Sequence, residues 1–160
     1  LVKRSILAFA LSLALPVVAL AVNSPFDRLA GQWSGAGTIQ MSDGNSEALR
    51  CRASYDVLSE GAGVQLAIRC AGQSYNFDLR SSAQYEGGKI TGIWNESTLN
   101  TGGQLSGNAK GDSIRIMANG QAFSAALTLV TNGNKQSVTI KSQQPNSKVV
   151  GATMTLSRSG

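Results

Sequence analysis

Residues 49–57, LRCRASYDV, and residues 64–70, VQLAIRC, decide the fold that this sequence predicts. Each stretch alternates apolar with polar residues, which is the pattern of a strand with one buried and one exposed face. An antiparallel hairpin with Cys51 opposite Cys70 places the apolar residues of both strands on one face. The same register sets Ala53 opposite Ile68, Tyr55 opposite Leu66 and Val57 opposite Val64, with residues 59–63 left for the turn.

This register also predicts a disulfide, because Cys51 and Cys70 are the only cysteines of the chain. Directly opposed residues of an antiparallel pair have Cα atoms about 4.5 to 5.5 Å apart, which is within disulfide reach. An even number of cysteines is typical of a disulfide in an oxidising compartment. The alternative is two free thiols that serve as small core residues.

The first 21 residues have the pattern of an export signal, which predicts such a compartment. Lys3 and Arg4 precede an apolar run over residues 6–15, and the segment ends in small residues at Ala21. The run is short against the ~20 residues of a membrane-spanning helix, so we expect a chain that does not span a membrane. We therefore expect a signal peptide over residues 1–21 and a single periplasmic or secreted domain over residues 22–160.

The rest of the chain repeats the pattern of short strands separated by turn residues. Gly87 and Gly88 can close a two-residue hairpin that pairs Tyr85 with Ile90. Only residues 24–30 look helical, for about one turn. Further strands are predicted over residues 33–41, 75–79, 105–109, 114–118, 123–129, 138–140 and 149–156. About eight to eleven antiparallel strands in a meander predict an all-β fold. We expect a lipocalin-like barrel, because closure removes exposed edges, with a two-sheet β-sandwich as the alternative.

Residues 26–33, FDRLAGQW, resemble the opening of lipocalins and other calycin barrels, where a short helical turn leads into Gly-x-Trp. The resemblance implies that Trp33 packs across one end of the barrel and that the opposite end admits a small apolar ligand. It also implies a basic residue on that tryptophan near the end of the last strand, for which Arg158 is the candidate. The second Gly-x-Trp, residues 92–94, has no counterpart in that family.

Two further resemblances point to small exported proteins. Residues 29–33, followed by two cysteines, resemble the periplasmic inhibitors of secreted metalloproteases. That likeness implies a calycin-like barrel with one disulfide, which inserts its N-terminal segment into the protease. The whole pattern is also similar to small uncharacterised exported proteins of Gram-negative bacteria.

The composition excludes most familiar chemistry. The chain has no histidine, so the usual base of a serine or cysteine nucleophile and the commonest zinc and haem ligands are missing. Glu96 is the one carboxylate worth attention, because it shares the face of Trp94, two residues before it. We assign no catalytic residue, no metal and no cofactor, and we expect a protein that is not an enzyme. Without the export signal the net charge falls from +5 to +3, which is not the charge of a nucleic-acid-binding protein.

Two surfaces are candidates for binding. The first is the barrel interior, where aromatic residues either fill the space or line a pocket. These candidate ligand-binding residues are Trp33, Tyr55, Tyr75, Phe77, Tyr85 and Trp94. The second is the outer face of the cysteine hairpin, where a basic patch could meet phosphates, anionic lipid or an acidic partner, or could simply be solvated. These candidate anion- or partner-binding residues are Arg50, Arg52, Arg69 and Arg80.

These patterns predict a non-catalytic barrel that binds a small apolar molecule or an envelope lipid. The alternative is a protease inhibitor or protein-interaction module that acts through residues 22–27 or through the arginine face. The sequence leaves the oligomeric state open.

Overall fold

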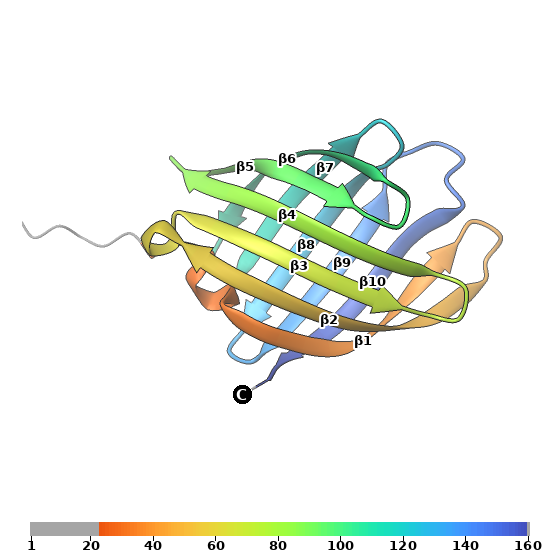
Figure 1. Ribbon diagram of the computed structural model, residues 1–160, viewed down its shortest axis with the longest axis horizontal. Helices are drawn as coiled ribbons and strands as arrows, with labels where there is room; N and C mark the ends of the chain where they lie inside the picture. The colour runs from red at the N-terminus through yellow and green to blue at the C-terminus, as the bar shows by residue number, and fades with distance from the viewer. Residues whose placement is uncertain (1–22, 160) are drawn as a thin grey trace, which may run out of the picture.

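The computed structural model describes residues 23–159 as a closed barrel of ten antiparallel strands (Figure 1). Residues 1–21, where the export signal is predicted, lie outside the described residues. The elements in chain order are η1 Asp27–Leu29, β1 Gly31–Met41, β2 Ser46–Leu58, η2 Ser59–Gly61, β3 Gly63–Ala71, β4 Asn76–Glu86, β5 Lys89–Glu96, β6 Thr101–Lys110, β7 Ser113–Gly120, β8 Ser124–Asn132, β9 Lys135–Ser142 and β10 Val149–Arg158.

Each strand pairs with its neighbours in sequence, and β10 pairs with β1 to close the sheet. Figure 1 shows β2, β3 and β4 crossing in front of β8 and β9, which form the opposite wall. This closure confirms the predicted barrel and is not compatible with the two-sheet sandwich. It also leaves every strand with two hydrogen-bonded neighbours, so the sheet has no edge.

The register predicted for the cysteine hairpin is confirmed. Cys51 lies opposite Cys70, with their Cα atoms 4.1 Å apart and a bond of 2.03 Å between the sulfur atoms. The structure also pairs Ala53 with Ile68, Tyr55 with Leu66 and Val57 with Val64, as the alternation predicts. The hairpin at Gly87 and Gly88 likewise has the predicted pairing.

The predicted boundaries differ from the structure where turn residues are weak signals. The helical turn is shorter than residues 24–30, because only Asp27–Leu29 form the 3-10 turn. The strand predicted over residues 75–79 begins at Asn76 and continues to Glu86, since paired serines in its middle hide the alternation. Phe123 lies in a loop and not at the start of a strand.

The barrel has two ends that differ in packing. We call the end covered by η1 and by the turns at residues 59–62, 87–88, 111–112 and 133–134 the base. We call the end formed by the loops at residues 42–45, 72–75, 97–100, 121–123 and 143–148 the rim. Odd-numbered strands run from the base to the rim and even-numbered strands return. None of the helical segments within residues 23–159 is long and apolar enough to cross a membrane.

Candidate binding sites

Trp33 closes the base of the barrel. Its side chain is 1% exposed, and its indole N–H donates a hydrogen bond to the Leu29 carbonyl at 2.7 Å. The guanidinium carbon of Arg158 lies 4.5 Å from the centre of the indole ring, close enough for a cation–π interaction. The same guanidinium donates to the carbonyls of Ala30 and Arg28, the latter at 2.7 Å. Arg158 therefore occupies the position that the resemblance implied, and it ties η1 to the last strand.

A chain of buried polar groups crosses the barrel just inside the base. The Tyr55 hydroxyl donates to Gln136 Oε1 at 2.9 Å, and Gln136 Nε2 donates to Thr131 Oγ1 at 3.2 Å. Gln136 is 0% exposed. Burial raises the pKa of Tyr55 well above its ordinary value, although the hydrogen bond with Gln136 opposes the rise. The phenol is therefore a neutral donor, and the three side chains join β2 to β8 and β9. Sequence reasoning did not identify this network, although Gln136 stands at an apolar position of its alternating strand.

The six candidate ligand-binding aromatic residues do not form one site. Trp33, Tyr55 and Tyr85 lie toward the base, where Tyr85 packs edge-on against Phe26 with ring centres 6.2 Å apart. The remaining three lie nearer the rim: Tyr75, Phe77 and Trp94. The six aromatic residues therefore fall into a group at the base and a group nearer the rim.

The inward-facing residues differ in how completely they are buried. Most inward apolar residues of β1, β2 and β10 are buried, including Ile39, Leu49 and Leu156, while Met41, Val57 and Val149 are only partly buried. On the other strands some inward apolar residues are also buried, such as Ile68 and Val138. The inward apolar residues that are only partly buried there include Leu66, Phe77, Leu79, Leu105, Ile116, Leu127, Leu129 and Ile140. Except for Leu127, these residues pack against the buried core. The inward positions of β3, β4 and β6 to β9 are therefore covered less completely than the core itself.

The inward glycines do not leave room inside the barrel. Gly35 on β1 and Gly92 on β5 are examples. A Cβ atom at Gly35 would lie 2.0 Å from the Thr155 carbonyl oxygen, and one at Gly92 would lie 2.2 Å from the Ser82 carbonyl oxygen. These glycines instead allow neighbouring strands to approach closely where the sheet curves.

Trp94 lies on the inward face toward the rim and is 5% exposed. Its ring packs edge-on against Phe123, with ring centres 6.0 Å apart. Its indole N–H is buried and has no hydrogen-bond partner among residues 23–159. The rim aromatic pair thus joins β5 to the loop between β7 and β8 and contains one unused donor.

Glu96 holds a rim loop in place. Its carboxylate accepts hydrogen bonds from the backbone N–H groups of Asp78 and Thr98, each at 2.9 Å, and of Leu99 at 2.6 Å. Burial alone would raise the pKa of Glu96, but these hydrogen bonds outweigh it and lower the pKa. Glu96 was the one carboxylate that the sequence analysis singled out, and both of its oxygen atoms accept hydrogen bonds from backbone N–H groups.

Glu47 plays the same part for the neighbouring loop, which the sequence did not predict. Its carboxylate accepts hydrogen bonds from the backbone N–H of Ser74 at 2.7 Å and of Tyr75 at 3.2 Å. The Ser74 hydroxyl donates to it as well, and the hydrogen bonds from Ser74 lower the pKa of Glu47. Glu96 of β5 therefore holds the rim loop at residues 97–100, and Glu47 of β2 holds the rim loop at residues 72–75.

The four candidate arginines do come together. Arg50 and Arg52 on β2, Arg69 on β3 and Arg80 on β4 are all exposed on the outer face. They line one shallow depression of about 1160 Å³. The sequence did not predict that Asp78, opposite Arg69 on β4, forms an ion pair with it at 2.6 Å.

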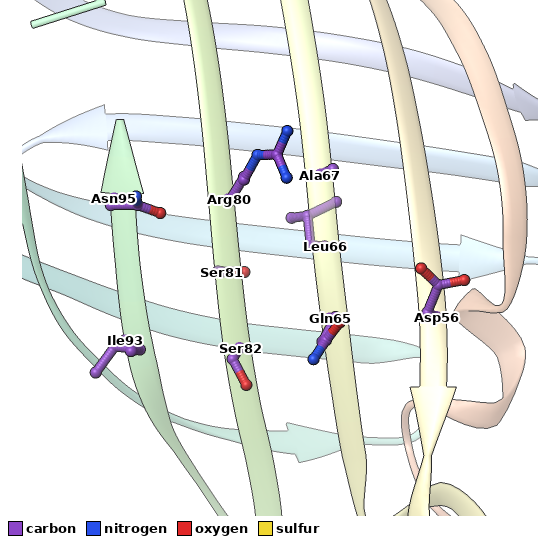
Figure 2. Close-up of a pocket in the computed structure, with 9 residues that line it drawn as sticks. All are labelled: Asp56, Gln65, Leu66, Ala67, Arg80, Ser81, Ser82, Ile93 and Asn95. Carbon is purple, nitrogen blue, oxygen red and sulfur yellow. The ribbon is translucent and has the colours of Figure 1, made fainter. Parts of the chain in front are cut away.

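A second, smaller depression of about 300 Å³ adjoins the first at Arg80. Figure 2 shows the Arg80 side chain extending from β4 toward Ala67 on β3, with Ile93 and Asn95 on the neighbouring β5. Arg80 therefore separates the two depressions. Within residues 23–159, no group of three or more cysteine, aspartate and glutamate side chains is placed to hold a metal ion.

Taken together, a closed antiparallel barrel, a 3-10 turn over its base and an arginine stacked on the tryptophan of Gly-x-Trp define a lipocalin-like fold. No family model and no curated protein matches the chain. Among solved structures, the chain is similar to Rv2717c from M. tuberculosis, with a TM-score of 0.66 and 10% identity over 84% of this chain and 94% of that one. It is also similar to the S-type phycobiliprotein lyase CPES from Guillardia theta, with a TM-score of 0.62 and 9% identity over 84% of this chain and 90% of that one. At these identities the likeness shows the fold alone.

Proposed function

We propose that the chain is an exported binding protein whose barrel holds a small apolar molecule or an envelope lipid and performs no chemistry on it. The observation that supports this most is the set of leucine and isoleucine residues at inward positions of β6, β7 and β8 that are only partly buried. Unfilled apolar space costs a protein stability, because the side chains around it lose packing contacts. An apolar ligand in that space would recover those contacts.

The chemistry of the space favours an uncharged or weakly polar ligand. Leu105, Ile116, Leu127 and Leu129 offer only hydrocarbon surface on the inward faces of β6, β7 and β8. The unpartnered indole N–H of Trp94 lies toward the rim of the same interior. Because a buried donor without a partner is costly, a ligand with one acceptor near its end would suit a site that is otherwise apolar.

A neutral probe tests the interior directly. The full chain, purified from an envelope preparation, should bind Nile red with a rise in fluorescence. Leu127→Trp adds bulk inside the barrel and should weaken that binding at least several-fold. Thr128→Trp adds bulk to the outward face of the same strand and serves as the matched control. Equal binding by both variants, with both folded by circular dichroism, would contradict an interior site.

Native and denaturing mass spectrometry of the same preparation tests whether the protein contains a non-covalently bound molecule. A bound molecule that appears only under native conditions would identify the ligand class. Recovery in the periplasmic or secreted fraction would support the proposed localisation, and recovery in the cytoplasm would contradict it. One of the two similar barrels is a lyase, so the fold by itself does not decide between binding and catalysis.

The N-terminal segment favours the binding protein over a protease inhibitor of the inserting kind. Ser24 and Phe26 are buried against the base, with Phe26 only 2% exposed. The Ser24 hydroxyl donates to the Gly61 carbonyl and also accepts a hydrogen bond from the Phe26 N–H. Insertion of this segment into a protease would first require its release from the barrel. The other part of the alternative, the arginine face, keeps its side chains exposed.

A further inference from the structure

The arginine face, which consists of Arg50, Arg52, Arg69 and Arg80, has an excess of positive charge. Arg52 lies directly opposite Arg69 on the neighbouring strand, and like charges in that position destabilise a sheet. Asp78 pairs with Arg69, which leaves Arg50, Arg52 and Arg80 without a carboxylate among the residues that line the depression. The lining therefore has four guanidinium groups, one carboxylate and a net charge of +3.

The floor of the depression lets anionic groups reach these arginines. Between the arginine side chains the outer face carries small residues, which are Ser34, Ala36, Ser54, Ala67 and Ala71. All four arginine residues of the depression are exposed. A guanidinium donates two parallel hydrogen bonds to phosphate, which is the geometry that phosphate recognition uses most.

Exposed apolar residues border the same surface. Leu99 is 76% exposed and follows Thr98, which lines the depression. Ile93 is 64% exposed and lines the smaller depression next to Arg80 (Figure 2). Arginines beside exposed, bulky apolar side chains are the combination that binds anionic lipid surfaces, where headgroups and the edge of the acyl region lie side by side.

We propose that the outer face of β2, β3 and β4 docks on a membrane surface rich in anionic phospholipid. The free arginines contact headgroup phosphates, and Leu99 and Ile93 reach the boundary of the acyl chains. Glu96 supports this contact, because its hydrogen bond to the Leu99 N–H fixes the loop that presents the leucine. The proposal stands on the outer surface and does not depend on what occupies the interior.

Vesicle co-sedimentation of the full chain tests the proposal. The protein should bind vesicles of phosphatidylglycerol mixed with phosphatidylcholine, should not bind phosphatidylcholine alone, and should dissociate as salt is added. Arg52→Gln and Arg80→Gln should each weaken partitioning about fivefold, which corresponds to about 1 kcal/mol per basic residue at an anionic surface. Leu99→Ser should weaken it as well.

Arg115→Gln is the matched control, since it removes the same charge from an exposed position on β7. This variant should keep nearly all of the vesicle binding. Equal losses for Arg115→Gln and Arg52→Gln would overturn the proposal, because overall charge and not this face would then drive binding. Absence of binding to the vesicles that contain phosphatidylglycerol would also overturn it, as would binding of an acidic protein by a chain that does not bind these vesicles. Nile red binding should be unchanged in all four variants, so failure here is distinguishable from failure of the interior site.

Discussion

The hydrogen bond between Tyr55 and Gln136 gives a sharp test of how the base is packed. Tyr55→Phe removes the donor and leaves the Oε1 atom of Gln136 unpaired in a side chain that is 0% exposed. An unsatisfied buried acceptor costs about 1 to 3 kcal/mol, so the free energy of unfolding should fall by that amount. Gln136→Leu removes the acceptor and leaves the Tyr55 hydroxyl unpaired at a similar cost.

The double variant should be far less destabilised than the sum of the two single variants. The double variant has neither the Tyr55 hydroxyl nor the Gln136 amide, so neither of these groups is left buried without the other. The double-mutant cycle should therefore give a coupling of about 1 to 3 kcal/mol. Thr131 loses its partner whenever Gln136 is replaced, so its contribution cancels from the cycle. Urea unfolding at neutral pH, followed by far-ultraviolet circular dichroism, measures the free energy of unfolding of the unchanged protein, the two single variants and the double variant.

A cycle on the outward pair Asp56 and Gln65 is the control, because both side chains are exposed on the same two strands that form the cysteine hairpin. An exposed cross-strand pair contributes about 0.2 to 1 kcal/mol, so that cycle should give a smaller coupling than the buried pair. If the coupling between Tyr55 and Gln136 were no larger than that of the exposed pair, the buried network would contribute nothing specific to stability, and the reasoning would be refuted.

Three further changes probe the disulfide, the rim and the strand spacing. Replacing Cys51 and Cys70 with alanine should lower the free energy of unfolding by roughly 3 kcal/mol, measured in urea, because the bond closes a loop of 19 residues. Glu96→Gln should flatten the loss of stability in acid. The folded carboxyl has a lowered pKa, so its contribution is complete above the ordinary value of 4.5 and is lost as the pH falls through the folded pKa. Gly103→Ala should destabilise the barrel by about 1 to 3 kcal/mol in a thermal melt, because its Cβ would lie 1.8 Å from the Asn119 carbonyl oxygen.

Each of these three predictions would be contradicted by one specific result. Unchanged urea midpoints after cysteine replacement would mean that the bond does not restrict the unfolded chain. A Glu96→Gln curve parallel to that of the unchanged protein would show that the carboxylate does not support the loop; Glu86→Gln, at an exposed site, is its control. Ser106→Ala on the outward face of β6 is the control for Gly103→Ala, and equal melting of the two would exclude the steric argument.

The sequence by itself determined the strands and their register wherever one face alternates cleanly with the other. Cys51 and Cys70, like Gly87 and Gly88, set a register with their immediate neighbours, because side chains two apart share a face and a hairpin joins adjacent segments. The same local regularity brought the arginines of β2 to β4 to one outer surface. These features involve neighbours in sequence, so periodicity was enough to predict them.

Only the tertiary structure decided what happens across the barrel. The contact of Arg158 with Trp33 and the hydrogen bond of Tyr55 to Gln136 join residues from opposite ends of the chain once β10 closes on β1. Alternation shows that a residue points inward, but it does not show whether opposite walls meet. How closely the inward side chains fill the interior depends on barrel curvature and on side-chain volumes summed over all ten strands, which no single segment of sequence contains.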